Sequence, residues 1–173
     1  MQIRLTGLTV TALGASALVA GPAGAQTLDL TITIPKMTVA EYHRPYVAVW
    51  LEKEGAAPRS LAVWYDFDMK ANEGTKWLRD VRQWWRAAGR SMSFPADGVT
   101  GATRAPGTHK LSFTAGRGPM PALSGGNYTL VVEAAREVGG RELLRLPFSV
   151  PAGGTAKAQG SGELGAVSLT VRR

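Results

Sequence analysis

The residues with the clearest chemical potential stand at positions 97–103, where the chain reads DGVTGAT. Thr100 and Thr103 place two hydroxyl groups on a backbone that otherwise carries almost no side-chain bulk. Small neighbours leave such a hydroxyl sterically open, as the attachment of a group to it would need. The same residues also suit a plain turn between strands, since Asp97 and Gly98 are both turn formers. Both interpretations stay open at this point.

A second set of candidates lies on the segment Thr75–Arg90, whose apolar spacing predicts one amphipathic helix. Its polar side carries Arg82 and Arg86, together with Arg79 and Arg90. A planar guanidinium binds phosphate through paired hydrogen bonds, so this face is suited to a phosphate group. A solvated helix face explains the same arginines, because surface helices carry charged residues on one side.

The tryptophans of this helix divide by position. Trp77 and Trp84 share a face with Val81 and Ala88, so we expect them in the core. Trp85 lies beside that face and is the better candidate for stacking on a flat aromatic ring. The helix is expected to cover an open edge or end of the remaining structure.

Other chemistry finds little support in the sequence. The chain has no cysteine, which excludes disulfides, thiolate metal sites and cysteine nucleophiles. Its two histidines, His43 and His109, do not stand at ligand spacing from another strong ligand, so we expect no metal site. No G-x-S-x-G motif occurs, so a serine hydrolase is not indicated. Turnover by side chains alone is therefore not expected.

The first residues predict export. Arg4 is followed by a small and apolar run and by an A-x-A-like site at Ala23–Ala25, which is typical of a signal peptide over 1–25, cleaved after Ala25. The apolar run is too short and too poor in large residues for a membrane span, so we expect a protein that does not span the membrane. The net charge of +7 favours acidic or phosphate-bearing partners, and nucleic acid is a poor candidate for an exported chain.

The remaining residues 26–173 predict a single mainly β domain. Residues 27–34 alternate between apolar and polar side chains, as a half-buried strand does. The runs 45–52 and 60–67 are apolar on both faces and predict central strands of a hairpin. Four further runs, at 109–114, 127–135, 141–150 and 165–171, are separated by turn signals, and Gly139 and Gly140 are expected to supply positive φ angles. About seven strands and one helix predict an immunoglobulin-like β-sandwich.

The loop at 97–103 resembles the D-x-x-[ST]-G-A-T signature of exported flavoproteins, such as the FMN-binding domains of ion-pumping quinone reductases. In that signature the last threonine carries FMN through a phosphoester bond that a separate FAD-dependent flavin transferase makes. Carried over by position, the resemblance implies Thr103 as the attachment residue, with Asp97, Thr100, Gly101 and Ala102 completing the recognition motif. Arg82, Arg86 and Trp85 are then the nearest candidates to hold the phosphate and the ring, because the joining segment 91–97 is short.

A longer resemblance covers roughly Leu28 to Val150. The segments RPYVAVWLE, LAVWYD, KWLRDVRQWWR, DGVTGATRAPGTHKLSF and GGNYTLVVEAAREVGGRELLRLPF look like the predicted periplasmic proteins of domain-of-unknown-function family 2271. Together the resemblances imply a periplasmic electron-transfer protein with covalent FMN, a carrier rather than an enzyme, whose partners are the flavin transferase and a membrane redox protein. The alternative is a noncatalytic immunoglobulin-like binding or structural module of the periplasm.

Overall fold

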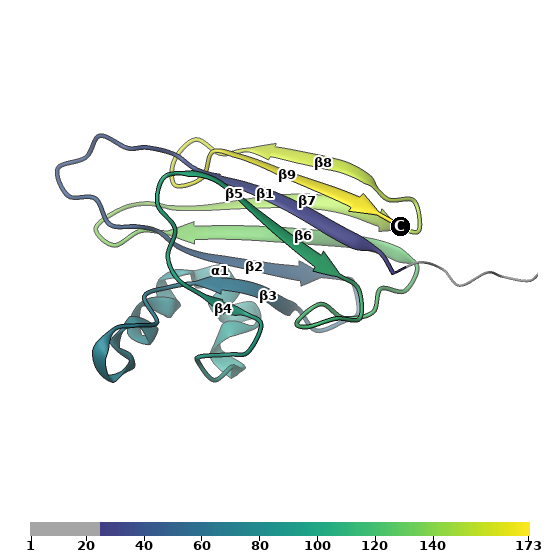
Figure 1. Cartoon of the computed structure of the whole chain (residues 1–173), viewed down its shortest axis with the longest axis horizontal. Helices are drawn as coiled ribbons and strands as arrows, with labels where there is room; N and C mark the ends of the chain where they lie inside the picture. Colours follow the sequence, from purple (N-terminus) through teal and green to yellow (C-terminus); the bar gives the residue numbers. More distant parts are fainter. Residues whose placement is uncertain (1–24) are drawn as a thin grey trace, which may run out of the picture.

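The computed structural model describes residues 25–173, which form two β-sheets packed face to face (Figure 1). The β-sandwich expected from the sequence is thereby confirmed. The proposed signal peptide lies outside the described residues except for Ala25.

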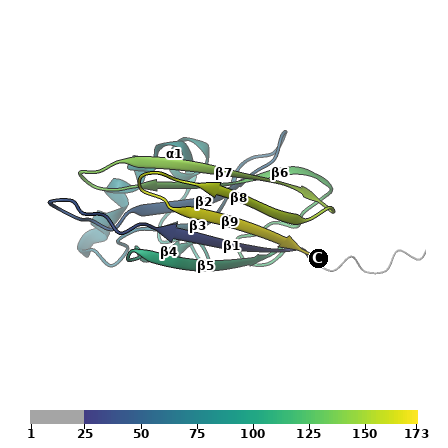
Figure 2. The same ribbon diagram turned by 90° about the horizontal axis from the view of Figure 1, so that it is seen from above.

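The two sheets differ in size and strand order. The first has four strands in the order β5 (Gly107–Thr114), β1 (Thr27–Ile34), β9 (Ala166–Arg172) and β8 (Gly154–Gln159). The second has five strands in the order β4 (Thr100–Gly101), β3 (Arg59–Trp64), β2 (Tyr46–Glu52), β6 (Gly126–Ala135) and β7 (Arg141–Val150). Figure 2, the view from above, shows that the strands of both sheets run along the length of the molecule.

The main core lies between the sheets and follows from the alternation seen in the sequence. On β1, Leu28, Leu30, Ile32 and Ile34 are almost completely buried, and the polar residues between them face outward. β2 is buried on both faces, as its sequence predicted: Val49 belongs to the core between the sheets, whereas Trp50 belongs to a second core. That second core lies on the outer face of the five-stranded sheet.

The second core is closed by a helical segment, which differs from the predicted helix. Residues Thr75–Arg90 do not form one α-helix: the structure has a 3-10 helix η1 (Lys70–Asp80), a short helix α1 (Arg82–Ala87) and a 3-10 turn η2 (Gly89–Ser91). Val81, with ψ at 71°, interrupts the helical path between η1 and α1. The segment packs on the outer face of the five-stranded sheet rather than on an edge or end of the sandwich.

This break changes the position of one tryptophan. Val81, Trp84 and Ala88 are buried as predicted, but Trp77 is 44% exposed, so its predicted place in the core is wrong. The reason is geometric: a 3-10 helix has three residues per turn, so the α-helical spacing from Trp77 to Val81 no longer places them on one face. Leu78 is buried instead.

Two strands were not predicted from the sequence. β4 is only two residues long and pairs in parallel with β3, so it is too short to show a periodic pattern. β8, with the sequence GTAKAQ, is an edge strand without large apolar residues. The β2–β3 and β6–β7 hairpins are confirmed by antiparallel pairing.

The turn between β6 and β7 uses its glycines differently from the prediction. The residue with positive φ is Val138, at 52°, and neither Gly139 nor Gly140 has one. A Cβ on Gly139 would lie 2.5 Å from the Arg136 guanidinium, and one on Gly140 would lie 2.9 Å from Glu163. The two glycines therefore leave room for the ion pair between Arg136 and Glu163.

One end of the sandwich gathers the loops that carry the candidate residues. Ile34 at the end of β1 pairs with Gly107 at the start of β5, and Tyr46 at the start of β2 pairs with Ala135 at the end of β6. β3 also ends beside the start of β2. These pairings bring four segments to the end that lies on the left in Figure 1, namely 35–45, 65–69, 102–106 and 136–140.

Candidate functional site

Thr103 is positioned by the parallel pairing of β3 and β4. Trp64 pairs with Gly101, so the residues two positions further along each chain, Asp66 and Thr103, also lie side by side. The Thr103 hydroxyl donates a hydrogen bond of 2.9 Å to Asp66 Oδ1. Thr103 is 9% exposed. A carboxylate 37 positions earlier in the chain therefore contacts the hydroxyl that the sequence motif singles out.

The other motif residues build the turn that leads to Thr103. Gly98 has φ at +70°, and the Thr100 hydroxyl oxygen accepts a hydrogen bond of 2.8 Å from the Ala96 backbone N–H. Thr100 also hydrogen-bonds Tyr65, whose pKa is raised because burial outweighs that bond. At Gly101 a Cβ would lie 3.1 Å from the Trp64 ring, which explains the glycine. Thr100, the other threonine of the motif, is thus engaged within the turn.

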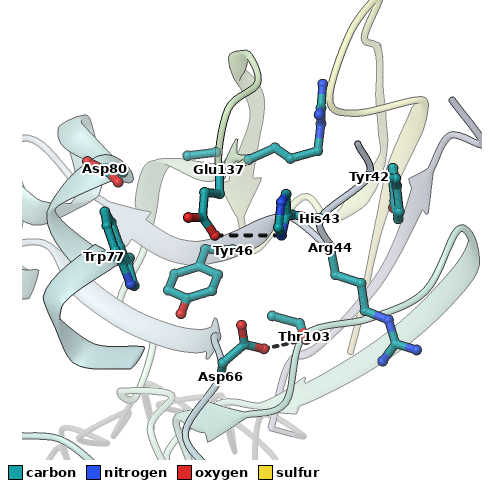
Figure 3. Close-up of a pocket in the computed structure, with 11 residues that line it drawn as sticks. Tyr42, His43, Arg44, Tyr46, Asp66, Trp77, Asp80, Thr103 and Glu137 are labelled. Atoms are coloured by element: carbon teal, nitrogen blue, oxygen red, sulfur yellow. Dashed lines mark hydrogen bonds and ion pairs between the residues drawn. The ribbon is translucent and has the colours of Figure 1, made fainter. Parts of the chain in front are cut away.

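Thr103 lines two neighbouring cavities. The first has a volume of about 310 Å³ and is drawn in Figure 3. It is lined by Tyr42, His43, Arg44, Tyr46, Asp66, Trp77, Asp80, Thr103, Ala135, Arg136 and Glu137. The second has a volume of about 390 Å³ and is lined by Arg44, Tyr65, Asp66, Phe67, Asp68, Met69, Ala102 and Thr103. Thr103, Asp66 and Arg44 are common to both.

Large apolar side chains are exposed around this site. Trp77 at the first cavity is 44% exposed, and Phe67 and Met69 at the second are 39% and 41% exposed. In Figure 3, Trp77 and Thr103 lie on opposite sides of Tyr46. The other large apolar side chains exposed within residues 25–173 are Val39 and Val138, on loops at the same end. The attachment candidate is therefore surrounded by surface suited to a flat apolar ring.

The basic side chains of the site differ in how many carboxylates they contact. Arg136 pairs with Glu163 at 3.0 Å, and both side chains are almost fully buried. His43 contacts the carboxylates of Glu41 and Glu137. Within residues 25–173, Arg44 takes part in no ion pair. Arg44 is thus the cation of both cavities that is available to an anionic group.

The backbone of Asp66 is fixed by close packing against η1. Gly74 of η1 packs so closely that a Cβ there would lie 2.1 Å from the Asp66 carbonyl oxygen. Burial raises the pKa of Tyr46 to about 12, and the negative charge of Asp66 adds to the shift, partly offset by a hydrogen bond to the Asp66 backbone. Tyr46 is therefore a neutral hydroxyl beside the Asp66 carboxylate at neutral pH.

The structure does not bring all of the predicted site residues together. Asp97 is exposed and lines a separate cavity of about 500 Å³. Arg82 and Arg86 are exposed, and Trp85 packs at the margin of the second core against Trp84. None of these four lines either cavity at Thr103.

Three residues of the site were missed by sequence reasoning, namely Asp66, Arg44 and Trp77. Asp66 carried one usable signal, because it follows a buried strand directly, at the position where strand ends often place polar site residues. Arg44 and Trp77 carried none, since one lies in an irregular loop and the other depends on where the helix breaks.

Comparison with known proteins identifies the family. The family model described as predicted periplasmic protein, domain of unknown function 2271, matches residues 27–166. No curated protein and no solved structure matches the chain. In the part of the chain that the structure describes, no helix is both long and apolar enough to cross a membrane. Because the match runs from β1 into β9 and includes both cavities, the chain belongs to this family of predicted periplasmic proteins.

Proposed function

We propose that this protein is an exported electron-transfer protein that carries FMN on Thr103 through a phosphoester bond. An FAD-dependent flavin transferase makes the bond, and a membrane redox protein exchanges electrons with the flavin in the periplasm. The protein acts as a redox carrier. FMN supplies the capacity to take up and release electrons, and the chain supplies the attachment point and the surroundings.

The observation that carries this proposal is the position of the Thr103 hydroxyl at the junction of two cavities. The first, at about 310 Å³, is within the range for small-molecule sites, about 300–1,000 Å³, and the second adjoins it. A tethered cofactor needs this arrangement, because its phosphate stays at the hydroxyl while its ring reaches a neighbouring hollow.

The residues present fit the two chemical parts of FMN. Arg44 lines both cavities and has no carboxylate partner among the described residues, so its guanidinium is available to the phosphate. Trp77 offers an exposed indole face to the ring on one side, and Phe67 and Met69 offer apolar surface on the other. The first cavity also holds the acidic side chains of Asp66, Asp80 and Glu137, and Arg44 is the cation that faces them without a carboxylate partner of its own among the described residues.

The proposal is tested by intact-mass measurement of the protein made in an exporting host together with an active flavin transferase. We expect one added FMN per chain and a yellow protein. Thr103→Ala should lose the added mass completely. Thr108→Ala is the matched control, because it removes a nearby exposed threonine hydroxyl from β5 and should keep the modification. An unmodified wild-type mass beside an active transferase contradicts the proposal.

The second candidate is a noncatalytic binding module of the periplasm. Its support is the clustering of Val39, Phe67, Met69, Trp77 and Val138 at one end of the sandwich, since exposed apolar surface often marks a protein contact. This function needs no modification of Thr103. The absorbance spectrum of the exported protein separates the two, because only the flavoprotein absorbs blue light.

A further inference from the structure

We propose that Asp66 accepts the proton of Thr103 during flavin attachment, so that the protein supplies a catalytic group for its own modification. This inference rests on the proposed function. It assigns a role to a residue that lies outside the sequence motif and is brought to it by the fold.

The contact geometry is that of a nucleophile and its base. Thr103 Oγ1 and Asp66 Oδ1 are 2.9 Å apart, within the range required for direct proton transfer. The hydroxyl is the donor, so its proton already points at the carboxylate. The backbone of Asp66 is fixed on the other side. Gly74 packs against it, and the Met69 N–H donates a hydrogen bond of 3.3 Å to the Asp66 carbonyl oxygen.

The other titratable groups nearby are less suited to this task. Tyr46, with a pKa of about 12, is protonated at neutral pH and cannot accept the proton. His43 is engaged with Glu41 and Glu137. Within residues 25–173, Asp66 is the group that hydrogen-bonds the Thr103 side chain.

The step balances without a change in oxidation state. Thr103 Oγ1 forms a bond to the phosphorus in the FMN half of FAD, which the transferase supplies. The bond from that phosphorus to the bridging oxygen breaks, and AMP leaves with the electron pair. The hydroxyl proton passes to Asp66, which later releases it to water. Because general-base assistance contributes about 10²–10⁴-fold to such reactions, the loss of the carboxylate should be measurable as a rate.

The charged and titratable groups that face Asp66 define the surroundings of any pH experiment. They line the two cavities that Asp66 shares. The segment before β2 and β2 itself contribute Tyr42, His43, Arg44 and Tyr46; the segment after β3 contributes Tyr65 and Asp68; η1 contributes Asp80; and the β6–β7 turn contributes Arg136 and Glu137. A ratio of variant to wild-type rates cancels titrations that the variants share, including those of the transferase.

The test measures the initial rate of FMN incorporation into the purified, exported protein, with purified flavin transferase and FAD. Asp66→Asn keeps an oxygen that can accept the hydrogen bond but cannot take the proton, and we expect its rate to fall by about 100-fold or more. Glu54→Gln is the control, because it neutralises an exposed carboxylate in the turn between β2 and β3 that lines neither cavity at Thr103, and its rate should stay within about twofold of wild type.

The pH profile separates proton transfer from a structural effect. The ratio of the Asp66→Asn rate to the wild-type rate should rise as the pH falls, because acid removes the advantage of the carboxylate. Asp66→Glu keeps a carboxylate and should recover part of the rate, which covers the case in which Asp66→Asn does not fold. Equal rates and parallel pH profiles for wild type and Asp66→Asn overturn the role of Asp66 as the proton acceptor and leave the proposed function standing. A wild-type protein that is never modified overturns the proposed function itself.

Discussion

Trp77 shows at the scale of one residue how a small change in backbone path creates a candidate binding surface. Its indole is 44% exposed at the first cavity, although its spacing to Val81 would bury it in a continuous α-helix. A nearly half-exposed tryptophan beside a hollow is unusual, because such a large apolar side chain gains most from burial. A flat ring stacked on it would cover this surface.

The fluorescence of the attached flavin tests this role of Trp77. Trp77→Phe should increase the flavin emission severalfold, because an indole in stacking contact quenches a flavin and a phenyl ring does not. Trp85→Phe is the matched control: it removes an indole of the same helical segment that does not line the cavity, and its emission should equal that of wild type. If Trp85→Phe brightens the flavin and Trp77→Phe does not, the ring lies over α1 instead.

At the scale of the element, the start of α1 is fixed from the neighbouring sheet. Glu133 of β6 is completely buried and accepts hydrogen bonds from the backbone N–H groups of Gln83 at 3.1 Å and Trp84 at 2.8 Å. Arg141 of β7 lies 3.6 Å from the same carboxylate. The first N–H groups of a helix lack partners within the helix, so Glu133 satisfies two of them.

This contact yields a prediction about stability. Glu133→Ala should lower the free energy of unfolding by about 3 kcal/mol, because it leaves buried N–H groups unpaired and leaves Arg141 without its partner. Glu54→Ala, in the exposed turn between β2 and β3, should change it by less than about 0.5 kcal/mol. Urea unfolding of both variants measures the difference, and a loss below about 1 kcal/mol for Glu133→Ala would show that the helix start does not depend on this carboxylate.

The elements that could be predicted from the sequence are those whose patterns are local, and the contact of Glu133 with α1 is an example of one that is not. β1 and the β2–β3 hairpin were predictable because their apolar patterns are local. The break at Val81 was not, since Glu133 holds α1 from 50 positions further along the chain. The site divides in the same way: Thr103 lies in a readable motif, whereas Asp66 reaches it through a two-residue parallel pairing that leaves no periodic signal.

At the scale of the whole molecule, β2 joins two hydrophobic cores. Val47, Val49 and Leu51 face the core between the sheets, while Ala48 and Trp50 face the core under the helical segment. The site at Thr103 depends on both, because β3 and β4 belong to the five-stranded sheet and Trp77 belongs to the helical layer. If β2 detaches from one core, its other face also loses the second core and meets water, so the two cores should unfold together.

We therefore predict that residues 26–173 unfold as a single domain. In a Trp64→Phe background, which removes the tryptophan of the core between the sheets, heating should give one transition, with the same midpoint for tryptophan fluorescence, which then reports Trp50 and Trp84 and the other tryptophans of the helical layer, and for far-ultraviolet circular dichroism, which reports the sheets. Leu30→Ala, on the opposite sheet, should destabilise the protein by about 2–5 kcal/mol and lower both midpoints equally. Val39→Ala, at an exposed loop position, should leave both nearly unchanged. Two separate midpoints, or a fluorescence midpoint that Leu30→Ala does not move, would mean that the helical layer and the sandwich unfold independently and that the Thr103 site spans two units.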